Sequence, residues 1–351
     1  MSVDRSVGRK RLRLAVVLLA TLAVAAGLLT TLGGISLRNV VTVGYVNRSI
    51  EMATPIALAA IGGLYAEKSG VFNIGLEGLM IIGAFTAAAS LFFFGGTSPT
   101  QGHVWLAILV SVVATTLLTV LFAVLLIRYK ADQIVAGLGV WFVALGFAPF
   151  GAALVWGSRS SPGLTSIHNV TVPYLSDIPV VGRIVFSQSP LVLLTALVVV
   201  VSWVVLYRTR YGYWIQAAGE SPEALDTAGI NVNRVRYASV IFSGAMAGLG
   251  GAVLLAHAGN FVGTGSTMVN GRGWIGIVAY LFGNYNPIGA AAAALLFGGL
   301  DMLNIQFQTL GIQLPARLIN LLPYVIVIVV LTLWGKTRSP SALGDPYESE
   351  H

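Results

Sequence analysis

Acidic and amide side chains occur within otherwise apolar stretches of this chain, where an ionised group is costly. Glu77 follows Asn73 by four residues, Asp301 precedes Asn304 by three, and Glu51 lies near the start of an apolar stretch. An ionisable group at membrane depth costs about 2.5 to 3.5 kcal/mol on insertion scales, so it needs a partner or a water-lined cavity. We therefore identify Asn73, Glu77, Asp301 and Asn304 as candidates to line a translocation pathway for polar solutes, whereas Glu51 can reach the outer interface.

Each of these candidates also has a structural explanation. Glu77 lies between Gly75 and Gly78, which suits a conduit or a hinge, but a carboxylate can equally cap helix ends or pair within a helix bundle. We favour the structural role for Glu77. Asp301 and Asn304 share one helical face, and this spacing fits either a polar pathway or an interhelical hydrogen bond.

Other kinds of chemistry find little support. The chain has no cysteine, and its histidines have no metal-ligand spacing. There is no His-Glu-x-x-His or Gly-x-Ser-x-Gly motif, and Gly335-Lys336-Thr337 resembles a phosphate-binding loop only superficially, because Val330 occupies the position of the required leading glycine. We expect no catalytic site, no metal site and no cofactor in this chain.

A polar segment, residues 208–236, contains residues that are typical of the start and the end of a short helix. Ser221 is a suitable N-cap, Pro222 suits the first helical position, Glu223 lies near the positive end of the helix dipole, and Gly229 can adopt a left-handed cap conformation. About seven residues would give about 10 Å of helix. Such a helix is marginal in water, so it is either a docking element for another protein or a capped connector.

The elements that must position these residues are membrane helices. Of 351 residues, 56% are hydrophobic and 9% are charged, whereas soluble domains carry roughly 25% charged residues. A span needs roughly 20 apolar residues. Ten stretches are predicted, at residues 14–32, 49–66, 74–94, 104–127, 133–156, 189–207, 237–258, 273–283, 287–305 and 318–335. The eighth is too short to span unaided, and the glycine-rich sequence before it indicates a broken or re-entrant element.

The basic residues predict how these spans are oriented. With the N-terminus inside, fourteen of the 20 Lys and Arg residues are cytoplasmic, as the positive-inside rule requires. We expect a cytoplasmic N-terminal segment (1–13), one transmembrane domain (14–335) with a cytoplasmic loop at 208–236, and a cytoplasmic tail (336–351). The alternative for the first segment is a cleaved signal peptide. The net charge of +7 reflects this orientation and not a nucleic-acid surface.

Long stretches of the chain resemble one family of transporters. Leu64 to Ala87 (LYAEKSGVFNIGLEGLMIIGAFTA), Gly229 to Ala252 and Gly271 to Gly299 are similar to permeases of ATP-binding-cassette (ABC) importers, in the branch for branched-chain amino acids, ribose-type sugars and nucleosides. The motif SGVFNIGLEG is most similar to that of nucleoside importers served by a basic-membrane-protein-type lipoprotein. One departure is Gly283 to Pro287, where relatives often carry Arg and Trp, although the Asn286 cap and the Pro287 helix start are retained.

The resemblance implies an all-α membrane protein with a type II-like ABC importer fold in a bacterial-type cell membrane. It implies a second, paralogous permease, a separate ATPase with tandem cassettes that holds ATP and Mg, and a substrate-binding lipoprotein. It also implies that residues of the polar loop couple the permease to the ATPase, namely Glu220, Ser221, Pro222, Glu223, Ala224, Asp226, Ala228 and Gly229. Nucleosides are the expected solute, with ribose-type sugars or branched-chain amino acids as alternatives.

Two other classes remain open at this point. A secondary transporter that works alone also contains broken helices and buried acids, but it has no need of a capped helix in a cytoplasmic loop. A structural membrane subunit would show no solute flux when reconstituted with its partners.

Overall fold

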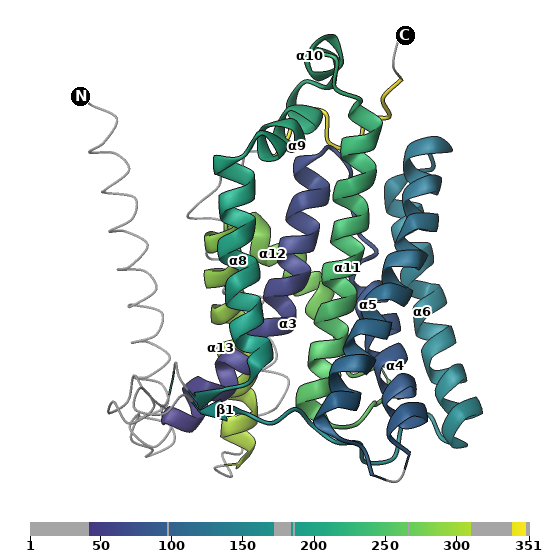
Figure 1. Cartoon of the computed structure of the whole chain (residues 1–351), viewed down its shortest axis with the longest axis vertical. Helices are drawn as coiled ribbons and strands as arrows, with labels where there is room; N and C mark the ends of the chain where they lie inside the picture. The colour runs from purple at the N-terminus through teal and green to yellow at the C-terminus, as the bar shows by residue number, and fades with distance from the viewer. Residues whose placement is uncertain are drawn as a thin grey trace.

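The structure is a computed structural model that describes residues 42–96, 98–171, 184, 187–265, 267–309 and 339–348. These parts of the chain are almost entirely helical, with one pairing of two short strands (Figure 1). The elements in order are α3 (Val43–Lys68), α4 (Leu76–Gly95), α5 (Gln101–Ala123), η1 (Val124–Arg128), α6 (Gln133–Trp156), β1 (Val170–Thr171), β2 (Ser187–Gln188), α8 (Pro190–Arg208), α9 (Arg210–Glu220), α10 (Pro222–Thr227), α11 (Val232–Ala258), α12 (Arg272–Phe282) and α13 (Pro287–Thr309).

The long helices agree with the predicted spans. Among the described residues, α3, α4, α5 with η1, α6, α8 and α11 are long and apolar enough to cross a membrane, and α12 and α13 contain shorter apolar helices. The all-α membrane fold is confirmed. The predicted seventh span begins earlier than expected, at Val232 instead of residue 237. The predicted spans at 14–32 and 318–335 lie outside the described residues.

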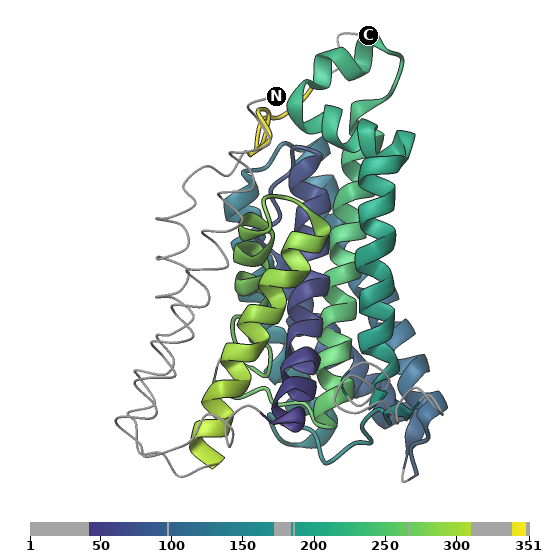
Figure 2. The ribbon, with the colours of Figure 1, turned by 90° about the vertical axis from the view of Figure 1, so that its left-hand side faces the viewer.

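Helix α3 forms the centre of the bundle. It packs against α8, α11, α12 and α13 and is enclosed by them in both views (Figures 1 and 2). Its sequence from Ala53 to Ala66 is rich in alanine and glycine, and every residue of this stretch is buried. Because lipid supplies no hydrophobic drive between membrane helices, close approach of small residues must stabilise the contact.

The glycine-rich stretch of α11 is used for close helix packing. Gly83 of α4 faces Gly248 of α11, so that a methyl group on Gly83 would lie 2.5 Å from the Gly248 carbonyl oxygen. A methyl group on Gly251 would overlap the carbonyl oxygen of Met80. Gly298 of α13 lies just as close to α3, against Ser49. These contacts fix the distances between α3, α4, α11 and α13.

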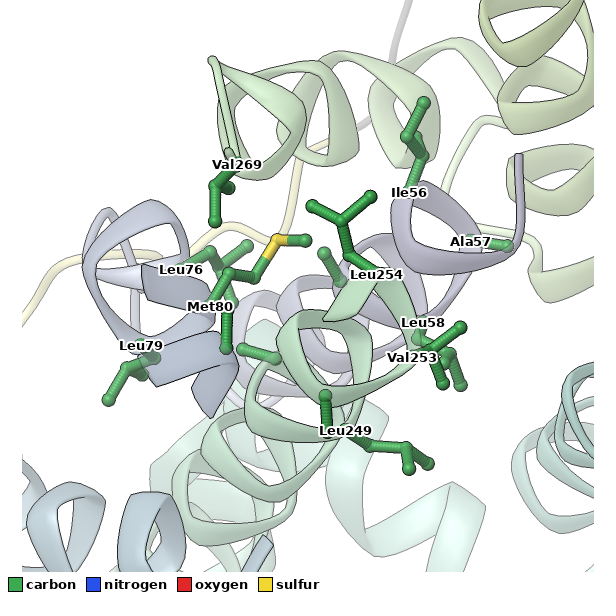
Figure 3. Close-up of a cluster of buried hydrophobic side chains, with 14 of the residues drawn as sticks. Ile56, Ala57, Leu58, Leu76, Leu79, Met80, Leu249, Val253, Leu254 and Val269 are labelled. Atoms are coloured by element: carbon green, nitrogen blue, oxygen red, sulfur yellow. The ribbon is translucent and has the colours of Figure 1, made fainter. Parts of the chain in front are cut away.

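Larger apolar side chains fill the spaces between these helices. Figure 3 shows Met80 of α4 and Leu254 of α11 pointing toward each other, with Val269 of the segment before α12 close to them. All three side chains are buried, and they belong to one hydrophobic cluster. The segment that precedes α12 is therefore anchored in the core.

One short helix packs against α3, α4 and α13. Helix α12 has 11 residues and is about 16 Å long, roughly half of a bilayer core, which confirms the predicted short eighth element. It turns into α13 at residues 283–286, where Asn286 Oδ1 accepts a hydrogen bond from Ile288 N at 2.9 Å. Pro287 begins α13, so the predicted cap and helix start are both present.

The two ends of the bundle differ in charge. One end carries α9, α10 and residues 339–348 (Figure 1, top). The described basic residues at the helix termini of this end are Lys68, Arg128, Lys130, Arg208, Arg210, Arg234 and Arg236, whereas the opposite end carries Arg48 and Arg159. We call the first the basic end.

Candidate functional site

The polar loop folds into two helices at the basic end. Helix α9 follows α8 after one residue, Thr209, and α10 follows α9 after one residue, Ser221. The sequence analysis predicted α10 but missed α9, whose residues Tyr211, Trp214, Ile215 and Ala218 recur at the spacing of one helical face. Together α9 and α10 form the most protruding part of the described chain (Figures 1 and 2).

Helix α10 is built largely as its sequence predicts. Pro222 occupies the first helical position and Gly229 adopts a φ of +79° just after the helix. Two details differ from the prediction. The helix has six residues instead of about seven, and Ser221 precedes it without a side-chain capping bond, because its backbone (φ −155°, ψ 79°) links directly to α9.

Helix α10 is anchored on one face and open on the other. Leu225 forms a small buried cluster with Ala218 of α9 and Val232 of α11, and Pro222 is buried beside them. The exposed residues are Ser221, Glu223, Ala224, Thr227, Ala228 and Gly229. A helix that packs tightly on one face and is exposed on the other is suited to bind another protein and to transmit its movement to the membrane helices.

Residues 339–348, which we call the C-terminal strap, connect α9 and α10 to the bundle. Ala342 N donates to Gly219 O at 2.8 Å, and Gly344 N donates to Gly70 O at 3.0 Å. Ser341 Oγ donates to Glu220 Oε2 at 3.0 Å. The strap therefore joins α9 to the loop that connects α3 and α4.

Three further contacts fix the strap at its end. Tyr347 donates its hydroxyl to Asp226 Oδ2 of α10 at 2.8 Å, and Lys130 forms an ion pair with Glu348. Arg236 of α11, which is only 3% exposed, donates to the carbonyl oxygens of Asp345 at 2.8 Å and Ala218 at 3.4 Å. Of the coupling candidates, Glu220 and Asp226 thus bind the strap and are not free on the outer face.

Glu77 occupies the point where α4 and α12 meet. Its carboxylate accepts hydrogen bonds from the backbone N–H groups of Gly271 at 2.8 Å and Gly273 at 2.7 Å. These N–H groups belong to the first turn of α12, where no intrahelical acceptor exists, and the negative charge lies at the positive end of two helix dipoles. The geometry is that of a carboxylate which caps a broken helix, the structural alternative favoured from sequence.

Asn73 supports the same region from the other side. Its Nδ2 donates to Ser243 Oγ of α11 at 2.9 Å, and its Oδ1 accepts from Gly75 N at 3.0 Å. The side chain is fully buried. Asn73 thus fixes the loop that leads into α4, one turn before Glu77.

Asp301 forms an ion pair with Arg272 at 3.1 Å, which links α13 to the start of α12. The predicted orientation placed Arg272 among the six basic residues outside, but its side chain is largely buried in the bundle. Asn304 belongs to α13, but its side chain lies outside the described residues. Glu77 and Asp301 therefore both contact the start of α12, which follows the break between residues 259 and 272, whereas Asn73 contacts α11. A role of these residues in translocation stays a prediction.

One buried acid near the basic end escaped the sequence analysis. Glu67, on the last turn of α3, is 1% exposed and accepts hydrogen bonds from the hydroxyl groups of Tyr280 and, at 2.7 Å, Tyr285. Tyr285 itself has a φ of +56°, a strained conformation for a residue with a side chain. The bond to Glu67 holds the turn between α12 and α13 in this conformation.

The comparisons with known proteins place the whole arrangement in one family. A family model described as branched-chain amino acid transport system / permease component matches residues 45–331. The chain belongs to this family. It is therefore a multi-pass membrane permease component, and the predicted resemblance is confirmed. It is not a catalytic subunit.

Three relatives illustrate the range of the permease family. The guanosine ABC transporter permease protein NupQ of Bacillus subtilis is 38% identical over 85% of this chain and 94% of NupQ. The nucleoside ABC transporter permease protein NupC of Lactococcus lactis is 37% identical over 84% of this chain and 93% of NupC. The putative glucose ABC transporter permease protein TsgC13 of Haloferax volcanii is 32% identical over 88% of this chain and 98% of TsgC13. No solved structure matches the chain.

Proposed function

We propose that this permease is the membrane subunit of an ATP-driven importer of nucleosides and that α10 couples it to a separate ATPase. The substrate class is supported by NupQ and NupC, whose names specify guanosine and nucleosides and which the chain matches almost from end to end. The observation that carries the coupling role is the exposed face of α10 above a buried Leu225. ATP and Mg bind to the ATPase in this proposal, and a lipoprotein delivers the solute.

The translocation route lies at the surface of this chain, against a second, paralogous permease. The three interior candidates are already engaged, because Glu77 and Asn73 are buried and hydrogen-bonded and Asp301 pairs with Arg272. A solute that entered between them would have to break several of these contacts. A route between two permeases leaves the contacts in place.

The basic end faces the cytoplasm in this proposal. Basic residues concentrate at cytoplasmic helix ends, and the described ones gather around α9, α10 and the C-terminal strap. Both termini are then cytoplasmic. Since the chain has no cysteine, a single Ala224→Cys variant in intact cells tests this orientation, because an impermeant maleimide should leave it unlabelled while a permeant maleimide labels it.

Coupling is tested with the double variant Glu223→Arg/Gly229→Val in the assembled transporter. Both residues are exposed, and valine is strained at the φ of +79° that Gly229 adopts. Guanosine uptake should be abolished while the amount of permease in the membrane is unchanged. Normal uptake would instead support a carrier that works without an ATPase.

A matched control exists at the opposite end of the bundle. Gly157, at the C-terminus of α6, has a φ of +67° and, like Gly229, no atom within 4 Å of an added Cβ. Gly157→Val carries the same backbone strain but lies far from α10 (Figure 1). It should therefore retain uptake.

Sugars are the second candidate substrate class, because TsgC13 is named as a putative glucose permease. Uptake of labelled guanosine, ribose and leucine should be compared in cells that express the permease with its ATPase, second permease and lipoprotein. Guanosine uptake that unlabelled ribose and leucine do not inhibit is the expected result. Competition by ribose would favour the sugar alternative.

A further inference from the structure

A large groove runs along the side of the bundle at the basic end. Its volume is about 860 Å³, and it lies between α8 and α11, with α9 above it and α3 behind it. It is separate from the break around Glu77, and it meets the exposed face of α10 only at Gly229. Its walls and its upper end differ in chemistry.

The walls are apolar and follow the direction of the membrane helices. Leu197, Val201 and Val205 line the groove from α8, and Phe242 and Met246 line it from α11. On α11 the lining extends from Arg234 to Met246, about 18 Å along the helix axis. One leaflet of a hydrocarbon core is about 15 Å thick, so the groove reaches from the membrane surface to about the middle of the bilayer.

The upper end of the groove carries an arginine and two aromatic residues. Arg234 of α11 lines it together with Tyr211 and Trp214 of α9. Arg234 is exposed, and neither of the ion pairs found among the described residues involves it. Trp and Tyr are enriched at the level of lipid headgroups, and basic pockets between membrane helices on the cytoplasmic side bind anionic headgroups.

A buried hydroxyl group also faces this space. Ser239 is 2% exposed and lines the groove, yet its Oγ has no hydrogen-bond partner among the described residues. A buried polar atom without a partner is unusual in a protein interior. It lies about one turn of α11 below Arg234, at the depth where the glycerol esters of a phospholipid follow its phosphate.

We propose that this groove binds one anionic phospholipid of the cytoplasmic leaflet. The phosphate lies at Arg234, an ester oxygen accepts a hydrogen bond from Ser239, and an acyl chain lies between Val201 and Phe242. A helix of the second permease could also cover an apolar groove, but its apolar surface would bury the Arg234 charge without a counterion, at a large desolvation cost. The proposal does not depend on which solute the permease carries.

The test uses brominated lipids and a single fluorescent label on the assembled transporter. Ala238 is exposed and lines the groove, and the natural chain, which has no cysteine, provides the background for an Ala238→Cys variant labelled with a fluorophore. The complex is reconstituted into phosphatidylcholine vesicles that contain brominated phosphatidylglycerol or brominated phosphatidylcholine. Half-maximal quenching should need about five-fold less of the brominated phosphatidylglycerol, the preference expected from one basic residue beside an anionic lipid.

Two controls make the result specific. Adding Arg234→Gln should remove the preference, whereas Arg159→Gln at the other end should leave it intact. A label at Val200→Cys, on α8 but outside the groove, should be quenched equally by both lipids. Equal quenching at Ala238→Cys, or a preference that survives Arg234→Gln, would overturn the proposal. No quenching at Ala238→Cys would also overturn it, because protein would then cover the groove.

Discussion

Replacing Glu77 by glutamine should loosen the junction between α4 and α12. The two carboxylate oxygens accept hydrogen bonds from Gly271 N and Gly273 N, whereas a glutamine side chain has one carbonyl oxygen and an NH₂ group. One of the two N–H groups would then face a donor. Since the side chain is only 3% exposed, water does not replace the lost acceptor.

The size of the effect follows from these contacts. A buried N–H left without an acceptor costs about 1 to 3 kcal/mol, and loss of the negative charge at the helix N-terminus adds about 0.5 to 1 kcal/mol. The lower desolvation cost of a neutral amide offsets part of this sum. We therefore expect Glu77→Gln to lower the free energy of local opening by about 1 to 3 kcal/mol.

Cysteine labelling measures this free energy directly. Val269 is fully buried beside the start of α12, and Val269→Cys is the reporter in the cysteine-free chain. A permeant maleimide reacts only when the segment opens, so its rate follows the population of the open form. Each 1.36 kcal/mol changes this population tenfold, and Glu77→Gln should speed labelling by about 5- to 160-fold.

Two controls separate local opening from general loosening. Glu51→Gln changes an acid that is only partly buried and should alter the labelling rate at Val269→Cys by less than about three-fold. A reporter at the buried Leu191 of α8, in the form Leu191→Cys, should be unaffected by Glu77→Gln. An unchanged rate at Val269→Cys in the Glu77→Gln variant would refute the capping role of Glu77.

Three further predictions concern packing and the basic end. Tyr285→Phe removes one of the two hydroxyl donors to the buried Glu67 and should destabilise the purified complex by about 1.5 to 3 kcal/mol. The measurement is the unfolding temperature, which should fall. Tyr129→Phe, at an exposed site, should leave it unchanged. Gly251→Ala should lower the unfolding temperature because its methyl group overlaps the Met80 carbonyl oxygen, while Gly146→Ala, with no atom within 4 Å, should leave it unchanged or raise it slightly. Deleting residues 341–351 removes the strap bond to Gly219 and should speed amide hydrogen exchange in α9; exchange rates equal to those of the full chain would contradict the role of the strap.

Features that depend on local sequence could be predicted. The span boundaries follow from runs of apolar residues, and α10 follows from Pro222 and Gly229, which act within one or two turns of the chain. The short α12 was predicted because its apolar run is too brief for a bilayer. Helix α9 was missed, although its apolar residues recur at helical spacing.

Features that depend on contacts between distant segments could not be predicted. Glu67 lies next to Lys68 at a helix end, where an acid is ordinarily exposed, and its partners Tyr280 and Tyr285 are more than 200 residues away. The C-terminal strap binds mainly through backbone groups such as Ala342 N, which carry no sequence pattern. The pairing of Asp301 with Arg272 likewise required knowledge of how α13 lies against α12.

The central claim, that α10 receives the movement of an ATPase, is tested most directly by crosslinking. Ala224 lies on the exposed face of α10, and Ala224→Cys with a short photoactivatable crosslinker should attach the permease to the ATPase in the assembled importer, with a yield that changes when ATP binds. Gly157→Cys at the opposite end should form no such product. If Ala224→Cys gave no crosslink to the ATPase with or without ATP, the coupling role of α10 would be contradicted.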